Sequence, residues 1–163
     1  MKVENLRELL VDELRDLYSA ETQLTKALPK VAKSASDTKL KHAIEHHLKE
    51  TEGHVERLEQ VFKELDESPK GKTCEGMKGL ITEAEERIKD GGDSPALDAG
   101  LIADAQRVEH YEISAYGSAR TFAELCGEKK VVTLLEKTLE EEKNADATLN
   151  KIAQSINVEA KAA

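Results

Sequence analysis

Hydrophobic side chains recur along most of this chain at alternating steps of three and four residues, and charged residues fill most intervening positions. This spacing places the hydrophobic residues on one face of an α-helix. It predicts helices over roughly 3–34, 38–66, 73–90, 95–126 and 128–157. The segments between them hold N-cap residues or helix breakers: Ser36 and Asp37, Pro69 and Gly71, Gly91 with Gly92 and Pro95, and Gly127. Pro29 lies inside the first segment, where we expect it to kink the helix or to end its regular part.

The hydrophobic line of each long segment turns polar near its middle. Its polar members are Glu21 in the first helix; His47, Thr51 and His54 in the second, with Glu50 beside them; Glu109 and Glu112 in the third; and Glu142 and Asp146 in the fourth. In a bundle the midpoints of the four helices meet at one level, so these side chains are expected to face one another in the interior. The two halves of the chain repeat the pattern, because Glu21 and Glu50 are 29 positions apart and Glu112 and Glu142 are 30 apart.

The lengths of the connections predict how the helices are joined. Short links follow the first and third long helices, which favours antiparallel neighbours, whereas the link from the second to the third is long and contains its own short helix. We therefore expect an all-α, single-domain protein over residues 1–163, a ferritin-like four-helix bundle with a long crossover. On the crossover helix, a hydrophobic stripe with Met77, Ile81 and Ile88 is expected to cover the flank of the bundle or to form a dimer contact.

Carboxylates in the core need positive partners, and no Lys or Arg occupies these polar positions. Two metal ions meet that need, and oxygen ligands with one or two imidazoles suit iron, with manganese as an alternative. The predicted ligands are Glu21, Glu50, His54, Glu109, Glu112, Glu142 and Asp146. We expect His47 to be a hydrogen-bonding neighbour of these ligands, and His42, His46 and His110 to lie at the surface.

Several segments carry a resemblance to a known family. They are DLYSAETQLTKALPK (16–30), HLKETEGHVERL (47–58), KTCEGMKGLI (72–81), RVEHYEISAYG (107–117) and TLEEEK (138–143). Across nearly its full length the chain resembles the YciF-like family of stress-associated bacterial proteins, which are ferritin-like and related to rubrerythrin. The resemblance implies the bundle fold, a di-iron site and a homodimer, and it leaves the reaction open.

The pattern departs from that of rubrerythrin at two positions. The second helix lacks a Glu-x-x-His step, because Glu50 is followed by Gly53 at that spacing and His54 comes one residue later. Asp146 stands where rubrerythrin has a histidine in its Glu-x-x-x-His step. The sequence therefore leaves the identity of the metal open.

Charge and cysteine content narrow the classes of partner. The net charge of −9 argues against nucleic acid and against an anionic membrane surface. The first residues, MKVENLRELL, contain no signal-peptide core, so we expect a cytoplasmic protein. Cys74 and Cys126 form no CxxC pair, which excludes a rubredoxin-like iron site. A redox reaction would then need a separate electron-donor protein.

Three functions are compatible with the sequence. The first is a di-iron enzyme that reduces peroxide or oxygen under stress. The second is iron binding or sequestration without turnover, and the third is a non-catalytic dimeric helical stress protein whose polar core is vestigial. Metal content after purification, followed by peroxide consumption with an artificial reductant, distinguishes these alternatives.

Overall fold

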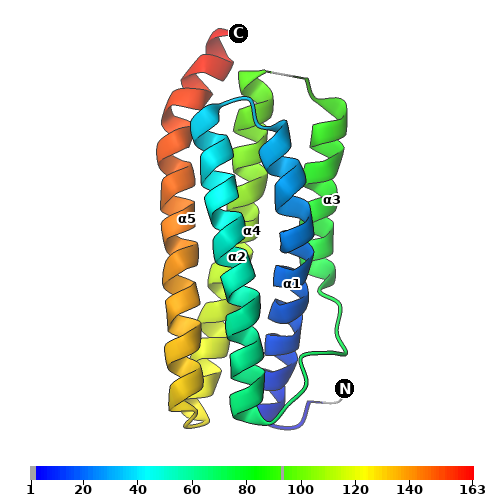
Figure 1. Cartoon of the computed structure of the whole chain (residues 1–163), viewed down its shortest axis with the longest axis vertical. Coiled ribbons are helices and arrows are strands. Elements are labelled where there is room, and N and C mark those ends of the chain that lie inside the picture. Colours follow the sequence, from blue (N-terminus) through cyan, green and yellow to red (C-terminus); the bar gives the residue numbers. More distant parts are fainter. Residues whose placement is uncertain (1–2, 93) are drawn as a thin grey trace.

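The computed structural model describes residues 3–92 and 94–163, and within them the regular structure is entirely helical (Figure 1). The helices are α1 (Leu6–Ser34), α2 (Thr38–Leu65), α3 (Glu75–Asp90), α4 (Pro95–Leu125) and α5 (Lys129–Ala162). The predicted all-α fold is confirmed, and the bounds differ from the prediction mainly at the C-terminus, where α5 extends beyond residue 157. Pro29 does not end α1, which continues to Ser34.

Side-chain caps start four of the helices where the sequence places polar residues. Asn5 accepts a hydrogen bond from Glu8 N, and Asp37 accepts one from Leu40 N. Ser94 and the thiol of Cys74 cap α4 and α3 in the same way. Each cap satisfies one of the free N–H groups of a first helical turn. Helix α5 begins without a side-chain cap, after a tight turn in which Gly127 has φ +78°.

The four long helices form one bundle, with α3 on its outside. Helix α1 packs against α2, and α4 packs against α5; contacts of α2 with α5 and of α1 with α4 close the ring. Figure 1 shows the α1–α2 link at one end of the molecule and the α4–α5 link at the other. The crossover carries α3 along α1 and α4, where Met77 is fully buried and Leu80, Ile81 and Ile88 are partly buried. The hydrophobic stripe of α3 therefore covers the flank of its own bundle.

The hydrophobic core consists of two separate clusters along the bundle axis. The first, here named the α1–α2 half, lies toward the α1–α2 link and includes Leu24, Leu28, Ile44, Leu101 and Leu149. The second, named the α4–α5 half, lies toward the α4–α5 link and includes Leu14, Leu58, Phe62, Tyr116 and Leu135. Polar side chains lie between the two halves, as the polar middles of the helical seams predict. No helix in the described part of the chain is long and apolar enough to cross a membrane.

Candidate metal centre

Six buried acidic and histidine side chains meet between the two halves of the core, and we call them the Glu/His cluster. They are Glu21 of α1, His47 and His54 of α2, Glu109 and Glu112 of α4, and Glu142 of α5. Glu21, His54, Glu112 and Glu142 have no exposed surface, and His47 is the most exposed member at 7%. All four long helices contribute, so the cluster is a property of the assembled bundle.

Helical spacing explains why α2 and α4 each supply two members. Glu109 and Glu112 are three residues apart, so both side chains emerge on the same face of α4. His47 and His54 are seven residues apart, or about two turns, and also share a face. Their rings lie with centroids 6.2 Å apart. The cluster thus extends along the bundle axis over two adjacent positions.

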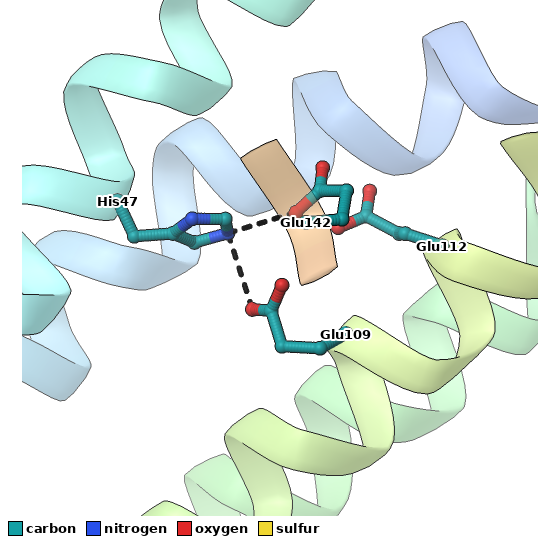
Figure 2. A group of neighbouring side chains, drawn as sticks. All are labelled: His47, Glu109, Glu112 and Glu142. Carbon is teal, nitrogen blue, oxygen red and sulfur yellow. Dashed lines mark ion pairs between the residues drawn. The ribbon is translucent and has the colours of Figure 1, made fainter. Parts of the chain in front are cut away.

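The cluster divides into two groups with ligand atoms within 4.8 Å of one another. In the first group, the Nδ1 atom of His54 lies 3.2 Å from Glu21 Oε1 and 3.0 Å from Glu142 Oε1. The second group contains His47, Glu109, Glu112 and Glu142 (Figure 2). There His47 Nε2 lies 3.2 Å from Glu109 Oε1 and 3.6 Å from Glu142 Oε2. Glu142 belongs to both groups, so one carboxylate connects them.

Most polar atoms of the cluster have no hydrogen-bond partner. Within the described residues, eight buried side-chain nitrogen and oxygen atoms lack one, and all belong to the Glu/His cluster. They include both oxygens of Glu112 and both oxygens of Glu142. Buried polar groups in folded proteins nearly always have partners, and leaving one without costs about 1–3 kcal/mol. Burying these atoms without partners therefore costs stability, and bound cations would provide the missing partners.

Electrostatics within the cluster work against ionised carboxylates. Burial raises the pKa of Glu21, Glu109 and Glu112 above the usual range for glutamate. Mutual repulsion raises the pKa of Glu109 and Glu112 further, because Glu142 and Glu21 lie close to both. These side chains therefore hold their protons up to a higher pH than they would in an unfolded chain. A bound cation would displace those protons.

His54 and Glu142 form the ionised pair of the cluster. Burial alone would lower the pKa of His54, but the carboxylates of Glu142 and Glu21 raise it to about 10. Burial would likewise raise the pKa of Glu142, but His54 and then His47 outweigh it and lower that pKa. One imidazolium therefore stands in for part of the positive charge that four carboxylates require.

Each histidine of the cluster turns its second ring nitrogen toward a carboxylate outside the cluster. The Nε2 atom of His54 lies 3.0 Å from Glu141 Oε2, and Arg57 donates to the same oxygen at 2.8 Å. The Nδ1 atom of His47 lies 3.4 Å from Glu50 Oε2. Such outer carboxylates orient metal-binding imidazoles and hold the proton on the far nitrogen. Both rings thus present one nitrogen to the interior.

Tyr116 connects the cluster to the α4–α5 half of the core. Its ring is fully buried, and its hydroxyl donates to Glu21 Oε1 at 2.5 Å. Burial and the negative charge of Glu21 raise the pKa of Tyr116, so the phenol keeps its proton. This contact occupies one oxygen of Glu21 and leaves Oε2 without a partner.

The structure brings five of the seven predicted ligands together: Glu21, His54, Glu109, Glu112 and Glu142. Glu50 and Asp146 lie outside both groups. Glu50 is 24% exposed and lies behind His47, away from the cluster interior. Asp146 is 17% exposed and accepts hydrogen bonds from the side chains of Gln106 and Asn150. Both carboxylates therefore have partners, or solvent, that the buried glutamates lack.

Two residues have a larger role in the geometry than the sequence suggested. His47 joins the second group directly, and its position on the polar line of α2, two turns before His54, was the available signal. Glu141 was not among the predicted ligands or their neighbours, and it reaches His54 and Arg57 on α2. No local pattern marks this contact, since the residues are more than 80 positions apart in sequence. His42, His46 and His110 are exposed, as expected.

The donor set fits two first-row transition-metal ions. Four carboxylates and two imidazoles around a pair of neighbouring positions are the ligands that iron and manganese accept. Binding would provide partners for the oxygen and nitrogen atoms that otherwise have none. The residues present therefore fit the metal pair that the sequence predicts.

Comparison with known proteins places the chain in a family. Residues 5–162 match the family model described as "Domain of unknown function (DUF892)". The chain is 45% identical over 154 residues to Protein YciF of Escherichia coli (strain K12), covering 94% of this chain and 93% of that protein. The crystal structure of the E. coli stress protein YciF superposes with a TM-score of 0.92 at 43% identity, over 94% of this chain and 98% of that one. YcfI of Rhodopseudomonas palustris superposes with a TM-score of 0.88 at 44% identity, over 91% and 95%. This chain belongs to the DUF892 family, and it is a homologue of the stress protein YciF.

Proposed function

We propose that the Glu/His cluster binds two metal ions, iron or manganese, and that the protein uses the iron form to reduce peroxide. The observation that supports this proposal is that every buried side-chain nitrogen or oxygen without a hydrogen-bond partner, in the part of the chain described, belongs to this cluster. A core that excluded metal would keep several acidic groups desolvated without compensation.

Each of the two groups of ligand atoms would hold one metal ion. Glu21, His54 and Glu142 would hold one ion, and His47, Glu109 and Glu112 would hold the second. Glu142 would serve both ions, since it lies in both groups. Binding would release protons, because carboxylates whose pKa is raised and an imidazolium must give theirs up to coordinate a cation.

A bound pair of ferrous ions would supply the two electrons needed to cleave an O–O bond, and a separate electron-donor protein would restore them. The chain's own residues contribute a dry site with fixed ligands. Glu141 contacts the outer nitrogen of His54 and accepts a hydrogen bond from Arg57, and Tyr116 donates to one oxygen of Glu21. The described relative YciF is a stress protein, and peroxide removal is a stress function that such a centre could perform.

Metal analysis followed by a peroxide assay tests this function. Protein refolded with ferrous iron without oxygen should carry two ions per chain and consume peroxide when an artificial reductant is supplied. Glu109→Ala combined with Glu112→Ala should lose the metal while the protein stays helical by circular dichroism. Two bound ions without peroxide consumption would instead support iron binding without turnover, and no bound ion would refute the metal centre.

A further inference from the structure

A cavity of about 180 Å³ adjoins the Glu/His cluster on the side of the α1–α2 half of the core. Hydrophobic side chains form most of its wall, among them Leu28, Ile44, Leu101 and Leu149. Polar residues line part of it, among them Glu109 and His47 of the cluster with Glu50 beside them, and we call this part its polar end. Protein interiors are normally packed with few voids larger than a water molecule. A cavity this large beside a reactive centre therefore calls for an occupant.

Alanines line the cavity where larger side chains would close it. Each of the five helices contributes one: Ala27, Ala43, Ala84, Ala105 and Ala145. In contrast, the α4–α5 half of the core is filled by large side chains that include Phe62 and Tyr116, both with 1% exposure or less. The four long helices run through both halves, whereas α3 packs only against the α1–α2 half, so the space lies on one side of the cluster.

The polar end of the cavity carries an unsatisfied acceptor. Glu109 is 2% exposed, lines the cavity, and its Oε2 atom has no hydrogen-bond partner. His47 Nε2 is likewise unpartnered at the same end. Exposed charged residues, Lys30 and Glu85, form an ion pair of 2.7 Å on the cavity's α1–α3 side. A ligand that fits must therefore be hydrocarbon along most of its length and polar at its inner end.

From this geometry we propose that the cavity is a substrate pocket, and that the peroxide reduced at the cluster is a small organic hydroperoxide. The hydrocarbon body would occupy the apolar wall region, and the O–O group would lie at Glu109 and His47. This inference rests on the proposed peroxide-reducing function. A cavity of about 150 Å³ lined by apolar side chains binds benzene, so this one suits a six-carbon ring or a branched chain of similar size.

The reaction balances with the electrons that the metal pair and its donor provide. The hydroperoxide ROOH accepts two electrons and two protons, its O–O bond breaks, and the alcohol ROH and one water are formed. The two metal ions that the cluster would hold would supply these two electrons, and the separate electron-donor protein would return them. The hydrocarbon group R is unchanged, so the alcohol product occupies the same pocket and serves as an inert probe of it.

Binding of cyclohexanol to the metal-free protein tests the pocket without the reaction. Nuclear magnetic resonance titration should show saturable shifts of the methyl signals of Ala105 and Leu28. Ala105→Leu and Ala84→Leu, from two different helices, should each weaken binding by about tenfold or more, because the added hydrocarbon occupies the space of the ring. Ala147→Leu, at an exposed position of α5 outside the cavity, should leave binding unchanged.

Kinetics on the iron-loaded protein test the substrate class. Ala105→Leu should lower the ratio of kcat/KM for cyclohexyl hydroperoxide to kcat/KM for hydrogen peroxide by about tenfold or more, because the added hydrocarbon takes the space of the ring. Hydrogen peroxide consumption without cyclohexanol binding would overturn the pocket while leaving the proposed function standing. Cyclohexanol binding without consumption of either peroxide would overturn the substrate assignment together with the proposed function. An equal loss of kcat/KM for both peroxides in Ala105→Leu and Ala84→Leu would also overturn the substrate assignment.

Discussion

Replacing Glu112 by leucine should stabilise the metal-free protein. Glu112 is fully buried, and neither carboxylate oxygen has a hydrogen-bond partner. Burial raises its pKa, and the charges of Glu21 and Glu142 raise it further, so the side chain is unfavourable there in either protonation state. Leucine has a similar size, no polar atoms and comparable helix propensity. The change therefore removes an unpaired polar group without opening a large void.

The expected gain follows from the cost of such a group. A buried polar atom without a partner costs about 1–3 kcal/mol, and apolar replacement of buried charged groups is neutral or stabilising by about 1–4 kcal/mol. For a chain of this length, 1 kcal/mol moves Tm by about 2–4 °C, so a gain of about 1–3 kcal/mol raises Tm by roughly 2–12 °C. Added metal should make the wild type the more stable of the two proteins, because one ion at a hundredfold excess over Kd stabilises the wild type by about 2.7 kcal/mol.

Thermal unfolding in EDTA and in manganese, followed by circular dichroism, measures both effects. Glu112→Leu should unfold at a higher temperature than the wild type in EDTA and should gain less on adding metal. Glu52→Leu, on the exposed surface of α2, is the matched control and should change neither value appreciably. The reasoning is refuted if the variant unfolds at a lower temperature in EDTA, or if elemental analysis finds that it keeps two ions per chain.

Further predictions concern pH, the outer carboxylates and assembly. The pKa of Glu109 and Glu112 is raised, and that of His54 is raised to about 10, so the native state holds more protons than the unfolded chain. The metal-free Tm should therefore fall as pH rises from about 5 to 9, and the gain on adding manganese should grow over the same range, both measured by calorimetry. Glu141→Gln should weaken manganese binding by about 10- to 100-fold in isothermal titration, whereas Glu140→Gln at the exposed neighbouring position should not. We also predict a homodimer, which light scattering at micromolar concentration checks: a mass near the 18.0 kDa of one chain would contradict it.

The level of the cluster could be predicted from the sequence because hydrophobic periodicity is a strong signal. Glu21, Glu109, Glu112 and Glu142 each interrupt an apolar line near the middle of a long helix. A charged residue there has no way to reach solvent once four helices pack, so burial at one level follows from the pattern alone. The structure places all four in the cluster.

The exact membership of the cluster depends on helix rotation, which periodicity does not determine. At about 100° per residue, Glu50 lies some 40–60° to one side of the line through His47 and His54. A rotation of that size decides whether a side chain faces the interior or the gap between helices. Asp146 is one turn beyond Glu142, about 6 Å further along α5, and its side chain is 17% exposed. It finds Gln106 on α4 as a partner instead.

The two halves of the core are packed differently on either side of the cluster. A layer of buried carboxylates that His54 neutralises only in part destabilises the bundle, so other parts of the structure must hold the four helices in place. The α4–α5 half can do this, because Phe62, Tyr116 and its leucines are almost completely buried. Tyr116 also extends the rigid half into the cluster by donating to Glu21. The α1–α2 half contains the alanine-lined cavity next to Glu109. Tight packing on one side of the cluster and an apolar cavity on the other form the arrangement on which the proposed pocket for a small apolar molecule rests.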